Sequence, residues 1–150
     1  MPKIDMFLDS SALIAGIVSA QGAARVLLLL GEDEKLILTV SEQVITEVER
    51  NLARKAPKTL PAAREMILRA NARILKDPSP EEVRVHLDWI TRPADVPILL
   101  VAARANVDFL VTLNTRHFIE DAQVSRRSGL RIGTSADALA WIRGQLSKGV

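Results

Sequence analysis

The sequence contains no cysteine and no tyrosine, only two histidines, and only 3% aromatic residues. The lack of cysteine excludes disulfide bonds, thiolate nucleophiles and cysteine-ligated zinc. A catalytic metal would therefore be held mainly by oxygen ligands, which favours Mg²⁺ or Mn²⁺ over zinc or copper. No run of about 18 uncharged apolar residues occurs, and the amino terminus lacks the pattern of a signal peptide, so we expect a cytoplasmic protein.

The rest of the composition is typical of one ordinary domain. The chain has 150 residues, of which 48% are hydrophobic. A chain of this length is able to bury a stable core without a structural metal or disulfide. The sequence contains no internal repeat, low-complexity tract or interdomain linker. We therefore predict a single domain over residues 1–150.

Charge is distributed unevenly along the chain, although the net charge is only +2. The segment from Arg50 to Lys76 holds eight basic residues against one acid, Glu65. Such a block is either a surface that contacts phosphate groups or a solvated helix face that keeps the protein soluble. The sequence leaves both interpretations open.

The hydrophobic pattern alternates between strands and helices. Apolar runs predict buried strands at 4–8, 35–40 and 108–113, with a last short strand at 131–134. Helices are predicted at 12–18, 21–30, 42–54, 61–75 and 80–89, after Pro97, and after Ser135, with Ser10 or Ser11, Ser41 and Ser135 as N-caps. Strands separated by helices imply right-handed crossovers, so we predict a three-layer α/β/α sandwich with a central, mainly parallel sheet.

Two polar residues directly follow predicted strands. Asp9 follows the first strand and Asn114 follows the strand at 108–113, so both belong at the carboxyl edge, where open parallel sheets bind ligands. Asp108 precedes its strand and is expected at the opposite edge as a structural cap. Asp95 begins a helix, whose dipole would stabilise its ionised form, although by itself this pattern indicates only an N-cap.

The helix after Ser41 carries three glutamates, Glu42, Glu47 and Glu49. Glu47 and Glu49 lie on opposite flanks of the apolar stripe centred near Val48, so either is able to lean toward a cleft. Helical periodicity does not choose among the three, and all of them are equally compatible with a solvated surface.

Four motifs, in this order and at these spacings, resemble the PIN-domain ribonucleases, especially the toxins of bacterial and archaeal toxin–antitoxin pairs. The motifs are FLDSSALI, VSEQVITEVERNL, RPADVPILLVAARA and DFLVTLNTRHF, and the resemblance covers Ile4 to about Ile142. It implies that Asp9, Glu47 and Asp95 match three acids of the family site. Many members have a fourth acid where this chain has Asn114, so binding of a second cation is expected to be weaker. Thr112 and Ser10 match hydroxyl positions that orient a metal-bound water or a carboxylate.

The resemblance implies a metal-dependent endoribonuclease that uses Mg²⁺ or Mn²⁺. The metal ligands would be Asp9, Asp95, Glu47 and Asn114, with Thr112 as a further site residue. The implied partners are RNA, a cognate antitoxin that docks in an apolar groove, and a second copy of the chain in a homodimer. We assign part of that groove to the helices between Ala12 and Leu30.

Three other functions are compatible with parts of the pattern. A phosphatase with Asp9 as nucleophile normally needs a second aspartate two residues later as general acid, where this chain has Ser11. A nucleotide-binding protein of this fold class normally has a glycine-rich turn after the first strand to hold phosphate, and the sequence DSSALIAG lacks it. The main alternative is a degenerate PIN-like module that binds RNA or protein without cleavage, and Asn114 is the residue that keeps it open.

Overall fold

The computed structural model describes residues 2–148, and its five strands form one parallel sheet. The strand order is β3-β2-β1-β4-β5, so β1 lies at the centre. The strands are β1 (Asp5–Leu8), β2 (Ile37–Ser41), β3 (Arg73–Leu75), β4 (Phe109–Val111) and β5 (Ile132–Gly133).

Helices connect the strands. They are α1 (Ser10–Val18), α2 (Ala23–Glu32), α3 (Glu42–Lys55), α4 (Leu60–Arg69), α5 (Pro80–Val85), α6 (Val96–Arg104), α7 (Ala122–Ser128) and α8 (Ser135–Lys148). Short 3₁₀ turns at Pro57–Thr59 and Pro93–Asp95 and a π turn at Thr115–Ile119 complete the fold. No single helix in the described chain is long and apolar enough to cross a membrane; α1 and α2 together have the length and composition, but the chain bends by 88° between them.

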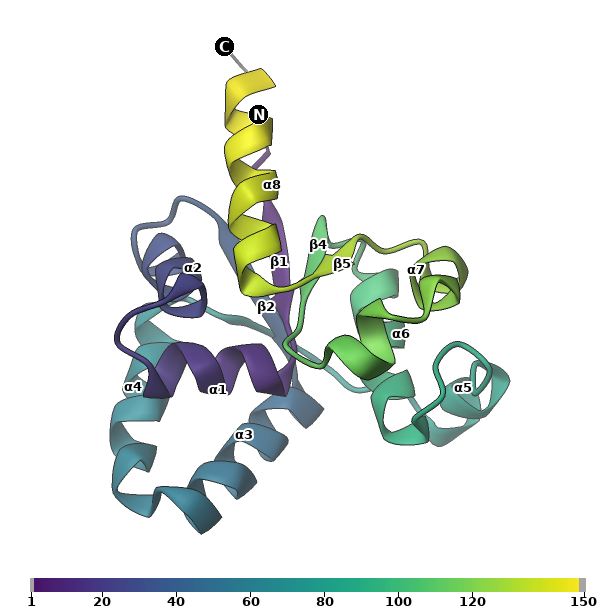
Figure 1. The fold of residues 1–150 in the computed structure, drawn as a ribbon. Coiled ribbons are helices and arrows are strands. Elements are labelled where there is room, and N and C mark those ends of the chain that lie inside the picture. Colours follow the sequence, from purple (N-terminus) through teal and green to yellow (C-terminus); the bar gives the residue numbers. More distant parts are fainter. Residues whose placement is uncertain (1, 149–150) are drawn as a thin grey trace.

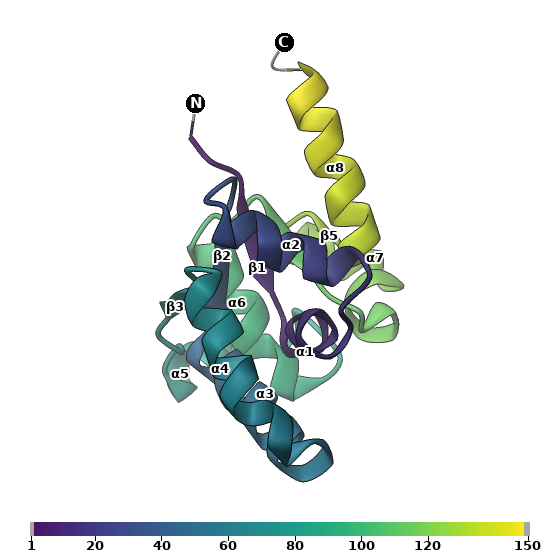
Figure 2. The same cartoon turned by 90° about the vertical axis from the view of Figure 1, so that its left-hand side faces the viewer.

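The sheet is the middle of three layers. Figures 1 and 2 show α2 and α8 on one face of the sheet and α6 on the other, while α3 and α4 project beyond the carboxyl ends of the strands. The predicted three-layer α/β/α sandwich with a parallel sheet is therefore confirmed.

Apart from Asp5 at the start of β1, the central strands β1 and β4 are apolar because helices cover both of their faces. Three residues of β1 and all of β4 are buried, as expected for parallel strands that read as continuous hydrophobic runs. The outer strand β3 differs, and Ile74 is 52% exposed. At the amino edge, the backbone N–H of Asp5 donates to Asp108 Oδ2 (2.8 Å), so Asp108 has the structural role predicted for it.

The predicted helix at 61–75 is wrong in its second half. Helix α4 ends at Arg69, Asn71 adopts the left-handed conformation (φ 57°), and Arg73–Leu75 then pairs with β2 as the edge strand β3. Asparagine tolerates this backbone conformation better than most residues, and it ends helices for that reason. Apolar residues continue at helical spacing across the break, so the pattern predicted one longer helix in place of a helix and a three-residue strand.

Two of the predicted N-caps are also wrong. The carboxylate of Asp9, and not Ser10 or Ser11, caps α1 by accepting from the N–H of Ala12 (3.0 Å). At α8, Thr134 Oγ1 accepts from the N–H of Asp137 while Asp137 Oδ2 accepts from the N–H of Thr134, which is a reciprocal capping box with aspartate in place of glutamate. The prediction for Ser41 is confirmed, since its hydroxyl accepts from the N–H of Val44 (3.2 Å).

The other helix boundaries shift by a few residues. The helix predicted at 21–30 spans Ala23–Glu32, and the helix predicted at 80–89 ends at Val85. At this second end, the N–H of His86 bonds to the carbonyl of Val83 and tightens the last turn, which stops the helix before Trp89.

Gly31 marks a close approach of α2 to its neighbours, and Gly31→Ala should destabilise the fold. A Cβ at this position would lie 2.7 Å from Leu38 Cδ1 and 2.8 Å from the carbonyl oxygen of Ala70. Overpacking of this kind costs about 1 to 3 kcal/mol. In contrast, nothing lies within 4 Å of a Cβ at Gly144 in α8, so Gly144→Ala should stabilise the protein by up to about 1 kcal/mol through helix propensity. Urea denaturation of the two variants measures both effects, and equal changes in the free energy of unfolding would contradict the packing argument.

Candidate functional site

Asp9 lies at the carboxyl end of the central strand and is only 4% exposed. Its Oδ1 accepts from the hydroxyl of Ser11 (2.7 Å) and from the N–H of Ala12, and its Oδ2 accepts from the hydroxyl of Thr112. Burial raises the pKa of Asp9 above its usual value, although these hydrogen bonds oppose part of the rise. The three donors fix the orientation of the carboxylate.

Thr112 and Asn114 follow β4 and tie it to the start of α1. Thr112 is fully buried, and its Oγ1 also accepts from the N–H of Asn114 (2.9 Å). The N–H of Leu113 donates to the hydroxyl of Ser11 (3.0 Å). Asn114 in turn caps the π turn, since its Oδ1 accepts from the N–H of His117 (3.3 Å). The ends of β1 and β4 therefore form one hydrogen-bonded unit.

Asp95 occupies the N-cap position of α6, but its side chain caps no backbone N–H. The residue is 6% exposed, and its Oδ2 is buried without a hydrogen-bond partner. Burial is the main cause that raises the pKa of Asp95 to about 6; the charges of Asp9 and Glu47 contribute to this rise, while Arg92 and His117 oppose it. A buried polar atom that has no partner is costly, so this carboxylate is unusual for a purely structural cap.

Of the three glutamates on α3, only Glu47 joins the other acids. Its Oε2 accepts from Gln43 Nε2 (3.3 Å) on the preceding turn. Glu49 instead pairs with Arg64 on α4 (2.7 Å), and Glu42 accepts from the N–H of Asp77 (2.9 Å). The packing of α3 beside α6 and the turn before it decides this choice, which helical periodicity left open.

These residues line one open cavity of about 350 Å³ at the carboxyl edge of the sheet. Four of the five predicted site residues, Asp9, Glu47, Asp95 and Asn114, face it, while Thr112 lies behind Asp9. Ser10, also predicted, lies in the wall. The full lining is Asp9, Ser10, Ser11, Ile14, Glu47, Arg50, Asn51, Arg54, Arg92, Asp95, Ile98 and Asn114. The cavity thus combines buried carboxylates with exposed arginines.

A family model described as the PIN domain matches residues 5–116 of the sequence. The chain belongs to the PIN domain family. No curated protein sequence matches it, but solved structures share the fold of this PIN domain.

Three crystal structures illustrate the likeness. PAE2754 from Pyrobaculum aerophilum has 21% sequence identity and a TM-score of 0.60, covering 94% of this chain and 98% of that protein. VapBC2 from Rickettsia felis, bound to a DNA fragment from its promoter, has 18% identity and a TM-score of 0.63, covering 87% and 98%. VapC20 from Mycobacterium tuberculosis, a toxin that cleaves the sarcin–ricin loop, has 16% identity and a TM-score of 0.54, covering 74% and 91%.

The donor atoms of this PIN domain suit a hard divalent cation. Asp95 Oδ2 is unpartnered, and Asp9 Oδ2 accepts only one hydrogen bond, so each has a lone pair free for a ligand bond. Glu47 and Asn114 supply further oxygens. Within residues 2–148, however, no three acidic or histidine side chains lie close enough to hold one ion jointly. The residue types nevertheless fit Mg²⁺ or Mn²⁺.

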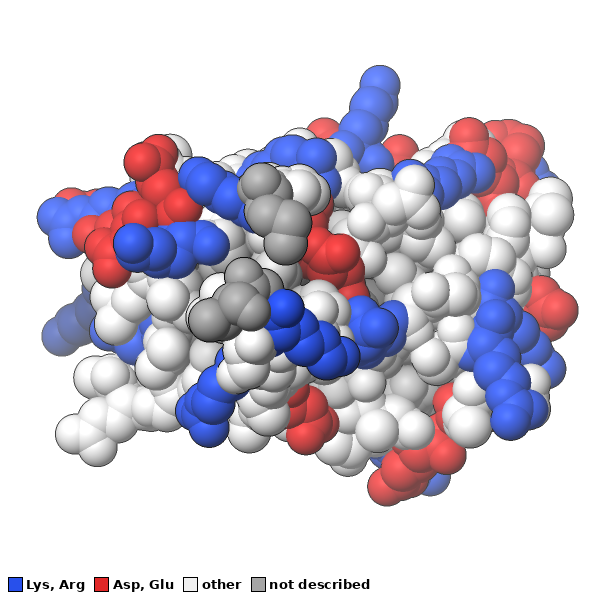
Figure 3. All heavy atoms as spheres, turned by 90° about the horizontal axis from the view of Figure 1, so that it is seen from above, with Lys and Arg blue, Asp and Glu red and all other residues white. Residues whose placement is uncertain are grey.

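The basic block around the PIN site is only partly available to a ligand. Arg50 and Arg54 on α3 reach the cavity. Other members pair with acids elsewhere, at distances of 2.7 Å: Arg64 with Glu49, Arg69 with Glu65, and Arg73 with Asp5. Figure 3 views the molecule from above, at the end opposite to the cavity, and there both signs of charge are interspersed. Arg50 and Arg54 are therefore the members of the block that line the cavity, while Arg64, Arg69 and Arg73 are paired at the surface.

Sequence reasoning missed two residues of the cavity, Asn51 and Arg92. Asn51 lies four residues after Glu47 and hence on the same helix face, so helical spacing from Glu47 would have found it along with Arg50 and Arg54. Arg92 lies three residues before Asp95, where no spacing rule points to it. His117, in the π turn Thr115–Ile119, also lies near enough to lower the pKa of Asp95.

In the metal-free PIN domain, Asp95→Asn should raise the free energy of unfolding at pH 7 by about 1 to 3 kcal/mol. The folded protein binds a proton at Asp95 with a pKa of about 6, whereas the unfolded chain does so near 3.9. Folding thus favours the protonated form, and this contribution is lost as the pH rises from about 4 through 6. Asp95→Asn has no carboxyl group to ionise at this position, so its free energy of unfolding does not lose this contribution. Its stability advantage over the wild type should therefore be absent at pH 4.

Urea denaturation with chelator at pH 4 and pH 7 measures the difference. Asp88→Asn, at an exposed position, is the matched control and should change stability little at either pH. An advantage of Asp95→Asn that is equal at the two pH values would rule out the ionisation of Asp95 as its cause.

Proposed function

We propose that this PIN domain protein is a Mg²⁺- or Mn²⁺-dependent endoribonuclease and the toxin of a toxin–antitoxin pair. The observation that carries the proposal is the convergence of Asp9, Glu47 and Asp95 on one cavity with arginines around it. Membership of the PIN family supports a nuclease. The fold shared with VapBC2 and with the RNA-cleaving toxin VapC20 supports the toxin assignment.

The carboxylates and arginines have complementary roles in phosphodiester hydrolysis. Asp9, Asp95 and Glu47, with the carbonyl of Asn114, would hold the cation. A bound divalent cation acidifies a water ligand and neutralises charge that develops on the phosphate. Thr112 and Ser11 keep the Asp9 carboxylate in a fixed orientation, which is the usual role of groups that surround metal ligands.

Three arginines, Arg50, Arg54 and Arg92, are placed to contact the RNA backbone. Contacts to phosphate position a strand without reading its sequence. The chain has few aromatic residues and no tyrosine, so stacking of bases on aromatic side chains is a minor part of recognition.

Exposed apolar side chains on α1 and α2 support the proposed partners. On α1 and α2, Val18 is 56% exposed, Val26 is 40% exposed and Leu29 is 49% exposed. Val26 and Leu29 are three residues apart and share one face of α2. We propose that this surface belongs to the groove that receives the antitoxin, and that two copies of the chain form a homodimer.

Cleavage of a mixed single-stranded RNA pool with Mg²⁺ or Mn²⁺ tests the nuclease activity. The wild type should cleave, a chelator should abolish cleavage, and Asp95→Asn should lower the rate by about 100-fold or more through loss of a ligand. Asp88→Asn should cleave at the wild-type rate, because Asp88 is exposed and is not among the residues that line the cavity.

A folded wild type that binds RNA but does not cleave it would contradict the nuclease and favour the degenerate binding module. Asn114→Asp would then be the first reversion to test, since it adds the missing carboxylate.

The proposed homodimer predicts a molar mass of about twice 16.5 kDa in sedimentation equilibrium at micromolar concentration. Dimerisation buries apolar surface and should persist at high salt, unlike an association driven by surface charge. A mass of one chain across the whole concentration range would contradict this part of the proposal, and the nuclease test would be unaffected.

A further inference from the structure

Gln43, in the first turn of α3, bridges two parts of the acidic site. Its side-chain amide donates to the carboxylate of Glu47 (3.3 Å) and to the carbonyl oxygen of Ala94 (2.8 Å). Ala94 directly precedes Asp95 in the 3₁₀ turn Pro93–Asp95. One amide group therefore touches a candidate ligand on α3 and the backbone of the turn that carries another.

The hydrogen bond from Gln43 to Ala94 connects α3 to the turn Pro93–Asp95. Within residues 2–148, no other hydrogen bond joins α3 to the turn Pro93–Asp95. Glu47 and Asp95 repel each other, as the contribution of Glu47 to the pKa of Asp95 indicates. Two like charges on separate elements need a neutral or positive group to keep them close.

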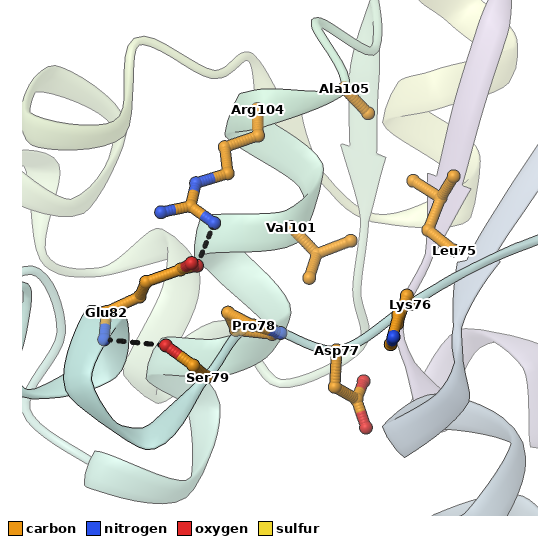
Figure 4. Close-up of a pocket in the computed structure, with 9 residues that line it drawn as sticks. All are labelled: Leu75, Lys76, Asp77, Pro78, Ser79, Glu82, Val101, Arg104 and Ala105. Atoms are coloured by element: carbon orange, nitrogen blue, oxygen red, sulfur yellow. Dashed lines mark hydrogen bonds and ion pairs between the residues drawn. The ribbon is translucent and has the colours of Figure 1, made fainter.

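The position of Gln43 is itself fixed by a second set of bonds. Its backbone N–H donates to Asp77 Oδ1 (2.9 Å), and the N–H of Asp77 donates to Glu42 Oε1 (2.9 Å). Asp77 lies in the wall of a separate cavity of about 520 Å³. Figure 4 shows its carboxylate directed away from Glu82 and Arg104, two charged residues of that cavity's lining. Asp77 and Ser41 satisfy the N–H groups at the start of α3, so the Gln43 side chain is free to reach across to Ala94.

The chemistry of glutamine suits this bridge. The amide has two N–H donors, one for the carboxylate and one for the carbonyl, and it carries no charge. A glutamate in its place would donate nothing and would add repulsion. A lysine would bond to Glu47 but would also compete electrostatically with a cation in the cavity.

We infer that Gln43 is a positioning residue that holds Glu47 against the turn carrying Asp95, so that both carboxylates reach one divalent cation. The inference rests on the proposed function, because it concerns the cation of that site. It makes Gln43 a determinant of metal affinity, and a contributor to fold stability only secondarily.

Three variants separate positioning from structure. Gln43→Ala removes the bridge and keeps the bond from the backbone N–H to Asp77. Asp77→Ala removes the N-terminal anchor of α3 and leaves the Gln43 side chain in place. Gln43→Met repeats the first change with a side chain of similar length that has no donor.

Mn²⁺ binding to each purified full-length variant is measured by electron paramagnetic resonance, and thermal unfolding is measured with chelator. Gln43→Ala and Gln43→Met should weaken Mn²⁺ binding about tenfold with little change in the metal-free melting temperature. Asp77→Ala should lower the melting temperature and keep Mn²⁺ affinity within about twofold of wild type. In RNA cleavage, raising the Mn²⁺ concentration should restore the rate of Gln43→Ala.

Two results would overturn the inference. The first is a Mn²⁺ affinity of Gln43→Ala equal to that of the wild type. The second is a loss of Mn²⁺ affinity in every variant that is proportional to its loss of melting temperature. The second result would make Gln43 a structural residue. If the wild type itself bound no Mn²⁺, the proposed metal-dependent function would fail first, and the inference with it.

Discussion

The parallel pairing of β1 with β4 is the constraint on which the site depends. Leu8 lies opposite Val111, and the N–H of Asp9 donates to the carbonyl of Val111 (3.0 Å). Asp9 and Thr112 therefore leave the sheet side by side, and the threonine hydroxyl reaches the carboxylate. A slip of one residue would turn each side chain to the other face. The register that buries the core thus also orients the first carboxylate.

The acidic site carries a cost that the rest of the fold must offset. Burial raises the pKa of both Asp9 and Asp95, which means that the folded state disfavours their ionised forms. Asp9 recovers part of the cost through three hydrogen bonds, whereas Asp95 Oδ2 has none. Groups that are poorly satisfied in the protein alone are typical of positions maintained for function at the expense of stability. On the proposed function, a divalent cation would supply the missing partner.

The sequence predicts the strands at the centre of the sheet and the edge to which each polar residue belongs. Asp9 and Asn114 meet at the carboxyl edge and Asp108 lies at the other, because strand direction alone fixes these positions. Strand β3 was missed because three residues are too few to show an alternating pattern. The choice of Glu47 depends on how α3 packs against the turn before α6, which is a tertiary contact between segments about fifty residues apart. The bridge by Gln43 was missed for the same reason.

On the proposed function, the balance of charge in the cavity would connect metal binding to RNA binding. Three carboxylates, Asp9, Glu47 and Asp95, face three arginines, Arg50, Arg54 and Arg92, so their charges nearly cancel when all are ionised. A cavity that is close to neutral attracts a phosphate backbone only weakly. With a divalent cation bound, the same cavity has an excess of positive charge, and its field favours an anionic strand. Asn114 strengthens this effect, because a fourth carboxylate in its place would cancel part of that excess. On the proposed function, the asparagine therefore weakens the binding of a second cation and at the same time strengthens the attraction that one cation exerts on RNA.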